Sequence, residues 1–139
     1  VDRNWDFQRD AWPPSSSALR FEAGSPNTMG QAALLASVDL LLETGMDRVS
    51  QRVLGNTEYL IRALNQLPGI RMAGRQERNR LSGIVSFVHE KIASNAIYEG
   101  LRKYEIVCTV RGPGVRISPH FYQDEEDLDV FLDALAHIV

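Results

Sequence analysis

The chain has 139 residues, of which 44% are hydrophobic and 24% are charged, and its formal net charge is -3. This is enough hydrophobic material for one buried core and too little for two well-separated ones. Its 15 Lys and Arg residues are interspersed with 18 acids, so the charge gives no basis for binding nucleic acid or an anionic membrane.

Cysteine and histidine usage excludes two further classes of protein. Cys108 is the only cysteine, which rules out an internal disulfide, and the three dispersed histidines lack the spacing of a metal site. The N-terminus lacks the basic and hydrophobic regions of a signal peptide, and the most hydrophobic run, 32–42, is far shorter than the roughly twenty residues of a bilayer span. We therefore expect a soluble cytoplasmic protein without a metal.

Residues 1–19 form the predicted lead-in to the fold. Trp5, Phe7 and Trp12 occur there among polar residues, prolines and serines without a clear period. This composition predicts an irregular segment whose aromatic side chains pack on another surface.

The octet 20–27 reads Arg-Phe-Glu-Ala-Gly-Ser-Pro-Asn and opens directly onto an apolar helix. Gly24 permits close approach of a ligand, Ser25 offers a hydroxyl, and Asn27 can cap a helix whose N-terminal amides carry partial positive charge. These residues indicate an anion site, with phosphate as the obvious ligand. The alternative is a turn followed by a helix cap.

Two long helices are predicted after this turn. Hydrophobic residues recur every three or four positions over 28–43, where Gly45 is the expected C-cap, and again over 47–67, which Pro68 and Gly69 end. Strand composition follows at 70–73 and 83–88, on either side of a polar loop.

The last third of the chain is predicted to contain a helix, a hairpin and a final helix. Ser94 or Asn95 can cap a helix that runs to 104, and 106–111 and 115–118 have the composition of two strands around Gly-Pro-Gly. Asp124 is the expected N-cap of a helix over 125–138. The order predicts an α+β fold, with helices on one face of a small, mainly antiparallel sheet. We place the domain boundary between 1–45 and 46–139.

The predicted hairpin contains the residues best suited to bind a substrate. Alternation along the second strand directs Arg116 and Ser118 to the face opposite Val115 and Ile117. A guanidinium on a rigid strand can donate two parallel hydrogen bonds to an α-carboxylate. The alternative is a solvated arginine that pairs with a surface acid.

Two blocks of this sequence resemble the class V aminotransferase and cysteine desulfurase group of pyridoxal-phosphate enzymes of fold type I. The first is the octet at 20–27, and the second is Val-Arg-Gly-Pro-Gly-Val-Arg-Ile-Ser-Pro-His-Phe-Tyr at 110–122, followed by acidic residues. The order and spacing of the blocks also fit. The resemblance covers nearly all of this chain but only about the C-terminal third of such an enzyme, which implies a fragment containing its small domain.

The resemblance implies roles for four residues. Arg116 matches the arginine that binds the carboxylate of a small amino-acid substrate, and Arg111 matches a second, less uniformly used arginine. Gly24 and Ser25 match the pair that contacts the phosphate of the neighbouring subunit's pyridoxal phosphate in a homodimer.

The lysine that forms a Schiff base with the cofactor has no counterpart in this chain. Lys91 and Lys103 are the only lysines, and neither has the sequence setting of that residue. We therefore expect no catalytic residue here, and an isolated chain that is inactive and does not bind the cofactor covalently. The parent enzyme is interpreted as an aminotransferase, epimerase or lyase.

Two alternatives stay open. A cysteine desulfurase or selenocysteine lyase is disfavoured because Cys108 precedes Arg111 within a strand, and the hairpin leaves no room for a loop with a mobile cysteine. A stand-alone domain of the same fold that holds a carboxylate ligand is the alternative of another class. His120 lies beside the arginine strand, as a substrate contact or as a packing residue, and Phe121 and Tyr122 are expected to anchor the last helix.

Overall fold

The computed structural model describes residues 14–22 and 24–139, so the predictions made for Trp5, Phe7 and Trp12 lie outside the described residues. Internal contacts divide the chain into two compact units, 1–40 and 41–139. This division lies within the first long helix, whereas the boundary expected from the sequence is the glycine after it.

The first unit contains a short 3-10 helix, Ala18–Phe21, and most of α1, Thr28–Thr44. Asn27 begins α1 as predicted, because its side-chain Oδ1 accepts a hydrogen bond of 2.9 Å from the backbone N–H of Gly30. Gly45 follows the last residue of α1 with φ of 86°, and its N–H bonds to the carbonyl of Leu41. This positive φ explains why a glycine ends the helix.

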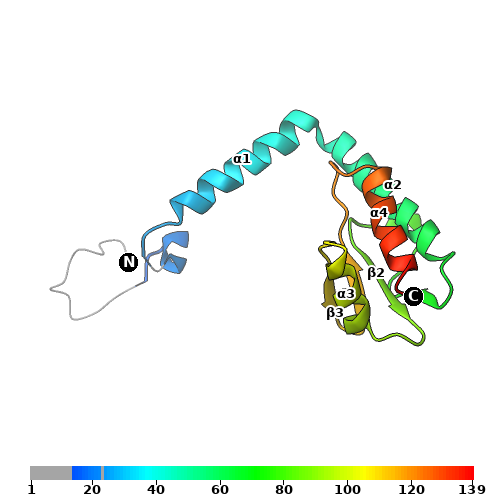
Figure 1. Ribbon diagram of the computed structural model, residues 1–139. Helices are drawn as coiled ribbons and strands as arrows, with labels where there is room; N and C mark the ends of the chain where they lie inside the picture. The colour runs from blue at the N-terminus through cyan, green and yellow to red at the C-terminus, as the bar shows by residue number, and fades with distance from the viewer. Residues whose placement is uncertain (1–13, 23) are drawn as a thin grey trace. The chain divides into compact units, whose positions relative to one another are not determined.

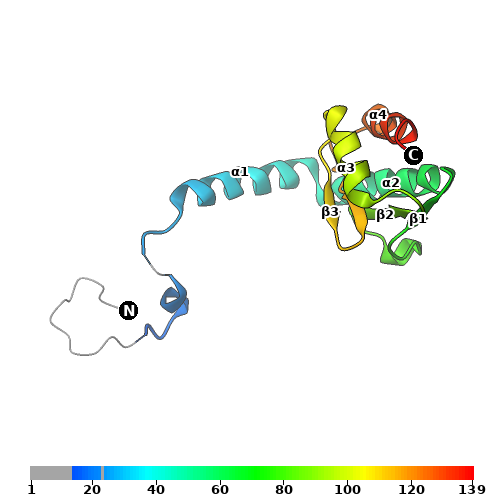
Figure 2. The same ribbon diagram turned by 60° about the horizontal axis from the view of Figure 1, so that its bottom comes forward.

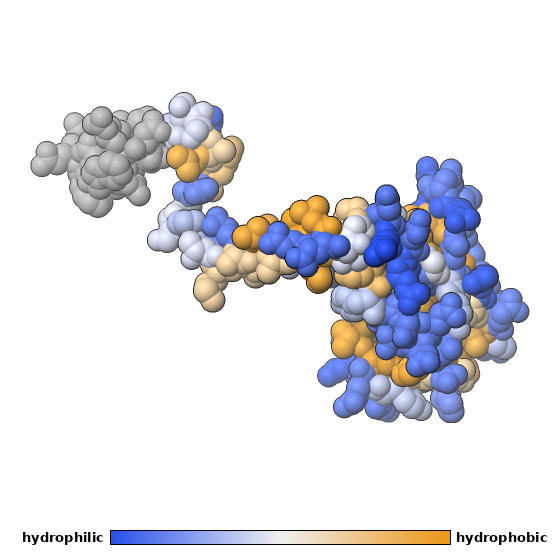
Figure 3. Space-filling view, turned by 90° about the horizontal axis from the view of Figure 1, so that it is seen from above, coloured by the Kyte–Doolittle hydropathy of each residue, from blue (hydrophilic) through white to orange (hydrophobic). Residues whose placement is uncertain are grey.

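Helix α1 is hydrophobic in composition, yet none of its residues is buried. Figure 3 shows hydrophobic side chains along α1 between polar ones. The large hydrophobic residues of α1 that are exposed are Met29, Leu34, Leu35, Val38, Leu40 and Leu42. An exposed apolar surface of this kind is typical of a helix that packs on another protein surface.

The second unit is a four-stranded sheet with three helices on one face (Figures 1 and 2). The strand order is β1-β2-β4-β3, and every neighbouring pair is antiparallel. The α+β fold predicted from the sequence is confirmed. The strands are β1 Ile70–Met72, β2 Val85–His89, β3 Thr109–Arg111 and β4 Gly114–Ile117, and the helices are α2 Met46–Leu64, α3 Ser94–Lys103 and α4 Glu125–Ala136.

The core lies between the sheet and these helices. Alternate residues of the two central strands point into it, as the period of two requires: Val85 and Phe87 from β2, and Val115 and Ile117 from β4. The helices supply residues at three- and four-residue steps, namely Leu60, Leu64, Ile97, Leu101, Leu128, Phe131 and Leu135. The opposite face of the sheet is therefore left for polar side chains.

Two buried polar residues of α2 fix loops around this core. The Asn56 side-chain amide donates to the carbonyls of His120 and Gln123, both at 3.0 Å, and the Thr57 hydroxyl donates to the carbonyl of Ser82 at 2.8 Å. Each bond satisfies a polar group that burial would otherwise leave unpaired. These bonds hold the segments that lead into β2 and α4.

In the second unit, the N-cap predicted for α4 is confirmed and the one predicted at Ser94 for α3 is wrong. Asp124 caps α4 through a reciprocal capping box with Asp127, as predicted for the N-cap. Ser94 does not cap α3: the N-cap is Ala93, and the Ser94 hydroxyl donates to the carbonyl of Pro113 at 2.6 Å. The serine is used for a tertiary contact that local sequence cannot reveal.

Candidate functional site

The open face of the sheet carries a row of polar side chains across three strands. In the register of the strands, Arg116 of β4 lies directly opposite Ser86 of β2 on one side and Thr109 of β3 on the other. The neighbours of Arg116 along β4, Val115 and Ile117, are buried in the core. The predicted alternation is therefore confirmed for Val115, Arg116 and Ile117, and Arg116 projects from the face that the helices leave uncovered.

Arg116 is half-buried and has a donor without a partner. Its Nε is buried and makes no hydrogen bond, and within the described residues its guanidinium has no ion pair. A buried N–H that has lost water without gaining an acceptor is costly, on the order of 1–3 kcal/mol. Such a group favours an acceptor that arrives from outside this chain, such as a ligand or another polypeptide segment.

Arg111 lies on the same face as Arg116, at the end of the neighbouring strand. It pairs with Gly114, two residues before Arg116, which places the two arginines at diagonal positions of an antiparallel pair. Diagonal side chains start about 7–8 Å apart, within reach of long residues. Arg111 is exposed and, among the described residues, has no ion pair. The structure thus brings both predicted arginines together on one face.

The hairpin that holds these arginines is short and fixed to the body of the unit. Only Gly112 and Pro113 separate β3 from β4, and Gly112 has φ of 55°, a conformation that favours glycine. The Ser94 hydroxyl bonds to the carbonyl of Pro113. The strand with Arg116 therefore has a defined position relative to α3.

The row around Arg116 can bind a carboxylate or a similar anion. Ser86 and Thr109 flank it with hydroxyl-bearing side chains on the same face. Ser118 lies beyond the end of β4 and lines a separate hollow with Leu60 and Phe131. Ser86 and Thr109 were missed at the sequence level. Their place beside Arg116 depends on strand register, and the strand composition of 83–88 does not by itself show which face Ser86 occupies.

The other predicted pair, Gly24 and Ser25, belongs to the first unit. Both residues are exposed and line a hollow of about 480 Å³ together with Glu22, Pro26, Asn27 and Gln31. Gly24 has φ of 149°, and no atom lies within 4 Å of the position that a Cβ would take there. The turn presents a hydroxyl beside a helix N-terminus, as an anion site requires, but the Glu22 carboxylate opposes an anion.

The surroundings of Cys108 are those of a structural thiol. It lies immediately before β3, half-buried and packed against the core, and burial raises the pKa of its thiol. A raised pKa leaves less thiolate near neutral pH, which is the opposite of what activates a nucleophilic cysteine.

The segment after β4 carries a small aromatic cluster. The His120 ring stacks on the ring of Tyr122 with centroids 4.6 Å apart, and it also contacts Phe121. Tyr122 is 73% exposed, so the prediction that it anchors the last helix is wrong. That helix is held instead by the buried Leu128, Phe131 and Leu135.

The described residues contain neither a membrane-spanning helix nor a metal-binding cluster. Within residues 14–22 and 24–139, no helix is long and apolar enough to cross a bilayer. The same residues contain no cluster of three His, Cys, Asp or Glu side chains that could hold a metal ion.

Comparison with known proteins assigns the family. The profile of the family described as "Aminotransferase class-V" matches residues 7–131. A cysteine desulfurase of Serratia proteamaculans is 35% identical over 68 residues, which cover 49% of this chain and 16% of that protein. A kynureninase of Geobacillus thermodenitrificans is 25% identical over 122 residues, which cover 85% of this chain and 28% of that protein.

A solved structure agrees with these relatives. It is described as the complex between the cystine C-S lyase C-DES and its reaction product cysteine persulfide, and it superposes with a TM-score of 0.76 at 28% identity. The match covers 86% of this chain and 32% of that one, so the chain spans less than a third of the length of each of these three proteins. The chain belongs to the aminotransferase class-V family.

Proposed function

We propose that this chain is the C-terminal part of a pyridoxal-phosphate enzyme acting on a small amino acid, in which Arg116 binds the substrate's α-carboxylate. The observation that carries this proposal is the buried, unpartnered Nε of Arg116 on the open face of the sheet. A carboxylate accepts two parallel hydrogen bonds from a guanidinium, so it would satisfy this donor and orient the substrate. Arg111, on the same face, adds positive charge next to it.

Pyridoxal phosphate, when bound, supplies an electron sink for a carbanion at the substrate's α-carbon. Gly24 and Ser25 are the residues that would hold its phosphate, across the interface of a homodimer. Their exposed turn at the start of α1 fits an anion, since Ser25 supplies a hydroxyl and the helix end supplies partial positive charge. Glu22 lines the same hollow, so further positive charge must come from outside this turn.

The lysine that holds the cofactor is proposed to lie in a part of the enzyme that this chain does not contain. Lys91 and Lys103 are both exposed, and neither belongs to the polar row around Arg116. The exposed hydrophobic residues of α1 support the proposal that a larger domain is missing, because such a domain would cover them. On this proposal the isolated chain is inactive.

Among amino-acid reactions, we favour a lyase that does not relay sulfur through a cysteine of this segment. The two-residue turn between β3 and β4 leaves no loop after Arg111 for a mobile cysteine, and Cys108 is half-buried before it. The 28% identity to the C-S lyase C-DES supports the same class. Aminotransferase and epimerase activities are compatible with the same carboxylate contact, and a cysteine desulfurase or selenocysteine lyase is the less favoured alternative.

Titration of the isotope-labelled 139-residue chain with L-alanine, followed by NMR, tests the carboxylate contact. We expect millimolar binding with shifts in the Arg116 side chain and in the amides of β4, weakened in Arg116→Gln and only partly kept in Arg116→Lys. Ethylamine, which lacks the carboxylate, is the matched control and should leave β4 unchanged. Equal shifts with Arg116→Gln would contradict the assignment.

Sequencing the coding region upstream of the Val1 codon tests whether the chain is part of a longer enzyme. A reading frame that continues into a domain with a cofactor-binding lysine supports the proposal. A start codon immediately upstream favours a stand-alone domain that uses the same arginine row to hold a carboxylate ligand.

A further inference from the structure

A second pocket lies at the edge of the sheet, between β2 and the loop that follows β1. Its volume is about 280 Å³, and all twelve residues that line it belong to the second unit. Ser86 is the only one of them in the polar row around Arg116, and none of the residues proposed above to bind cofactor or substrate lines the pocket. The pocket therefore adjoins the proposed amino-acid site at Ser86, but its charged residues come from another part of the chain.

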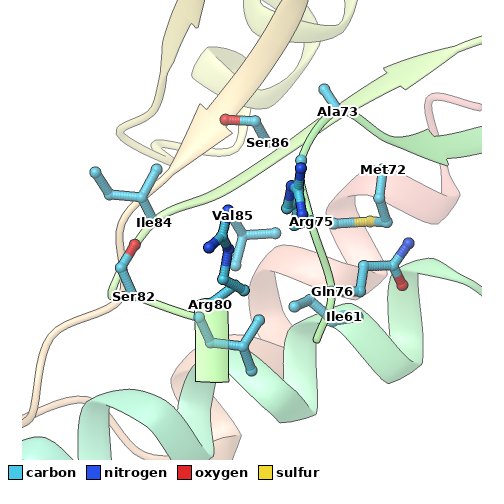
Figure 4. A pocket seen from close by; sticks show the side chains of 12 residues that line it. Ile61, Met72, Ala73, Arg75, Gln76, Arg80, Ser82, Ile84, Val85 and Ser86 are labelled. Carbon is cyan, nitrogen blue, oxygen red and sulfur yellow. The ribbon is translucent and has the colours of Figure 1, made fainter. Parts of the chain in front are cut away.

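Two arginines dominate the charge of this pocket. Figure 4 shows the side chains of Arg75 and Arg80 extending from the loop toward β2, on either side of Val85. No acidic residue is among the twelve that line the pocket. Among the described residues, neither arginine has an ion pair or a side-chain hydrogen bond. Two unneutralised guanidinium groups thus face the same space.

The neighbouring Arg78 provides a contrast within the same short stretch. It belongs to the 3-10 helix Arg78–Arg80, but its Nε pairs with Glu58 Oε1 of α2 at 3.2 Å, and it does not line the pocket. Arg78 is therefore paired with an acid. Among the described residues, Arg75 and Arg80, which line the pocket, have no counter-charge.

The loop that forms the pocket wall contacts α2 at two residues, Thr57 and Glu58, and the C-cap of α2 at Asn65. Asn65 donates to Gln76 Oε1 at 2.9 Å, Glu58 pairs with Arg78, and Thr57 donates to the Ser82 carbonyl at 2.8 Å. These contacts connect the polar loop to α2 beside the pocket.

The rest of the lining is largely hydrophobic. Ile61, Met72, Leu81 and Val85 supply apolar side chains, and Ser82 and Ser86 add hydroxyl-bearing residues near the arginines. The volume is just below the range of about 300–1,000 Å³ that is usual for small-molecule sites. It can hold a ligand about the size of one amino acid.

We propose that this pocket binds a small organic acid, with the carboxylate between Arg75 and Arg80 and an apolar body against the hydrophobic lining. Guanidinium groups without a counter-charge favour an anion, and a carboxylate matches their planar donors. The apolar lining adds a preference for an acid with a branched or cyclic hydrocarbon part over a bare anion. This site is additional to the proposed amino-acid site and does not depend on the enzyme assignment.

The test is an NMR titration of the labelled 139-residue chain with 4-methylpentanoate, and with inorganic phosphate and 4-methylpentan-1-ol as comparison probes. We expect saturable shifts with the acid in the amides of residues 72–86. Arg75→Gln and Arg80→Gln should each weaken binding roughly fivefold to tenfold. Both side chains are exposed, so the variants should keep the fold, and unchanged amide shifts in α3 and α4 would verify this.

Arg78→Gln is the matched control, because it removes the same charge from the same loop but not from the pocket. It should change the affinity for 4-methylpentanoate less than twofold. An equal loss in all three variants would show general electrostatic attraction and overturn the proposal. So would binding of the alcohol as tight as that of the acid, phosphate binding as tight as that of the acid, or acid shifts confined to β3 and β4.

Discussion

The Ser94 hydroxyl, at the first residue of α3, donates a hydrogen bond of 2.6 Å to the carbonyl of Pro113 in the turn between β3 and β4. That turn joins the strands that carry Arg111 and Arg116. The contact therefore links the helix layer to the two arginines of the open sheet face, over a separation of 19 residues.

Ser94→Ala should destabilise the chain by about 1 kcal/mol, since it removes one hydrogen bond and leaves the Pro113 carbonyl to water. Urea unfolding measures this change, and faster hydrogen exchange at Gly114 would localise it to the hairpin. Ser50→Ala, at an exposed position of α2, is the control and should be neutral or slightly stabilising. Equal effects of the two substitutions would argue against a special role for the Ser94 contact.

Glu105→Gly should stabilise the chain by about 0.5–1 kcal/mol. Glu105 has φ of 60°, and it follows α3 in a Schellman motif: its N–H bonds to the Arg102 carbonyl, and the N–H of Ile106 bonds to the Leu101 carbonyl. Glycine adopts this conformation without steric cost. Glu105→Ala removes the charge but keeps the Cβ, so a gain as large in alanine as in glycine would attribute the effect to charge at the helix end.

The Tyr59 hydroxyl should lose its proton at a higher pH than that of an ordinary tyrosine. Its hydroxyl donates a hydrogen bond of 2.5 Å to Asp129 Oδ1, and this bond raises the pKa of Tyr59 above its usual value of 10.0. The folded chain holds the proton more tightly than the unfolded chain does. The contribution to stability is thus fully present below about pH 10 and is lost as the pH rises through the higher folded pKa.

Absorbance of tyrosinate during an alkaline titration measures this shift. Tyr59→Phe should remove the last component to titrate, and Asp129→Asn should bring that component to lower pH. Tyr122→Phe, at a residue that is 73% exposed, is the control that should leave the late component unchanged. A late component that survives in Tyr59→Phe would refute the assignment.

Cys108 should react slowly with an aromatic disulfide reagent at neutral pH in the folded chain. Burial raises the pKa of its thiol, so the thiolate fraction is smaller than in a free cysteine, and half-burial also restricts access. The folded state favours the protonated thiol, so this contribution to stability is present below the unfolded pKa and is lost as the pH rises through the folded pKa. Because it is the only cysteine, the reagent reports on one site. A rate equal to that of the urea-unfolded chain would contradict the structural role.

The elements that could be predicted from the sequence are those set by local patterns. The three-to-four-residue periodicity located α1, α2 and α4, the alternation in 115–118 placed Arg116 away from the core, and Asn27 and Asp124 were recognised as caps. Apart from the β3–β4 hairpin, pairing across the sheet could not be predicted, because the register that sets Ser86 beside Arg116 depends on contacts distant in sequence. The pocket of Arg75 and Arg80 was missed for the same reason, since its residues gave only the pattern of a polar surface loop.

Asn56→Ala should destabilise the chain by about 2 kcal/mol, because it leaves two carbonyls without a donor. The Asn56 side chain is only 3% exposed, and its amide donates to both His120 and Gln123 in the segment between β4 and α4. Asn56→Asp should cost more, since it turns a donor into an acceptor that faces two carbonyl oxygens in a buried site. Urea unfolding gives both values, with Asn95→Ala, at an exposed position of α3, expected to change stability by less than about 0.5 kcal/mol. If Asn56→Asp were tolerated as well as Asn56→Ala, the paired carbonyl contacts could not be what holds this segment against α2.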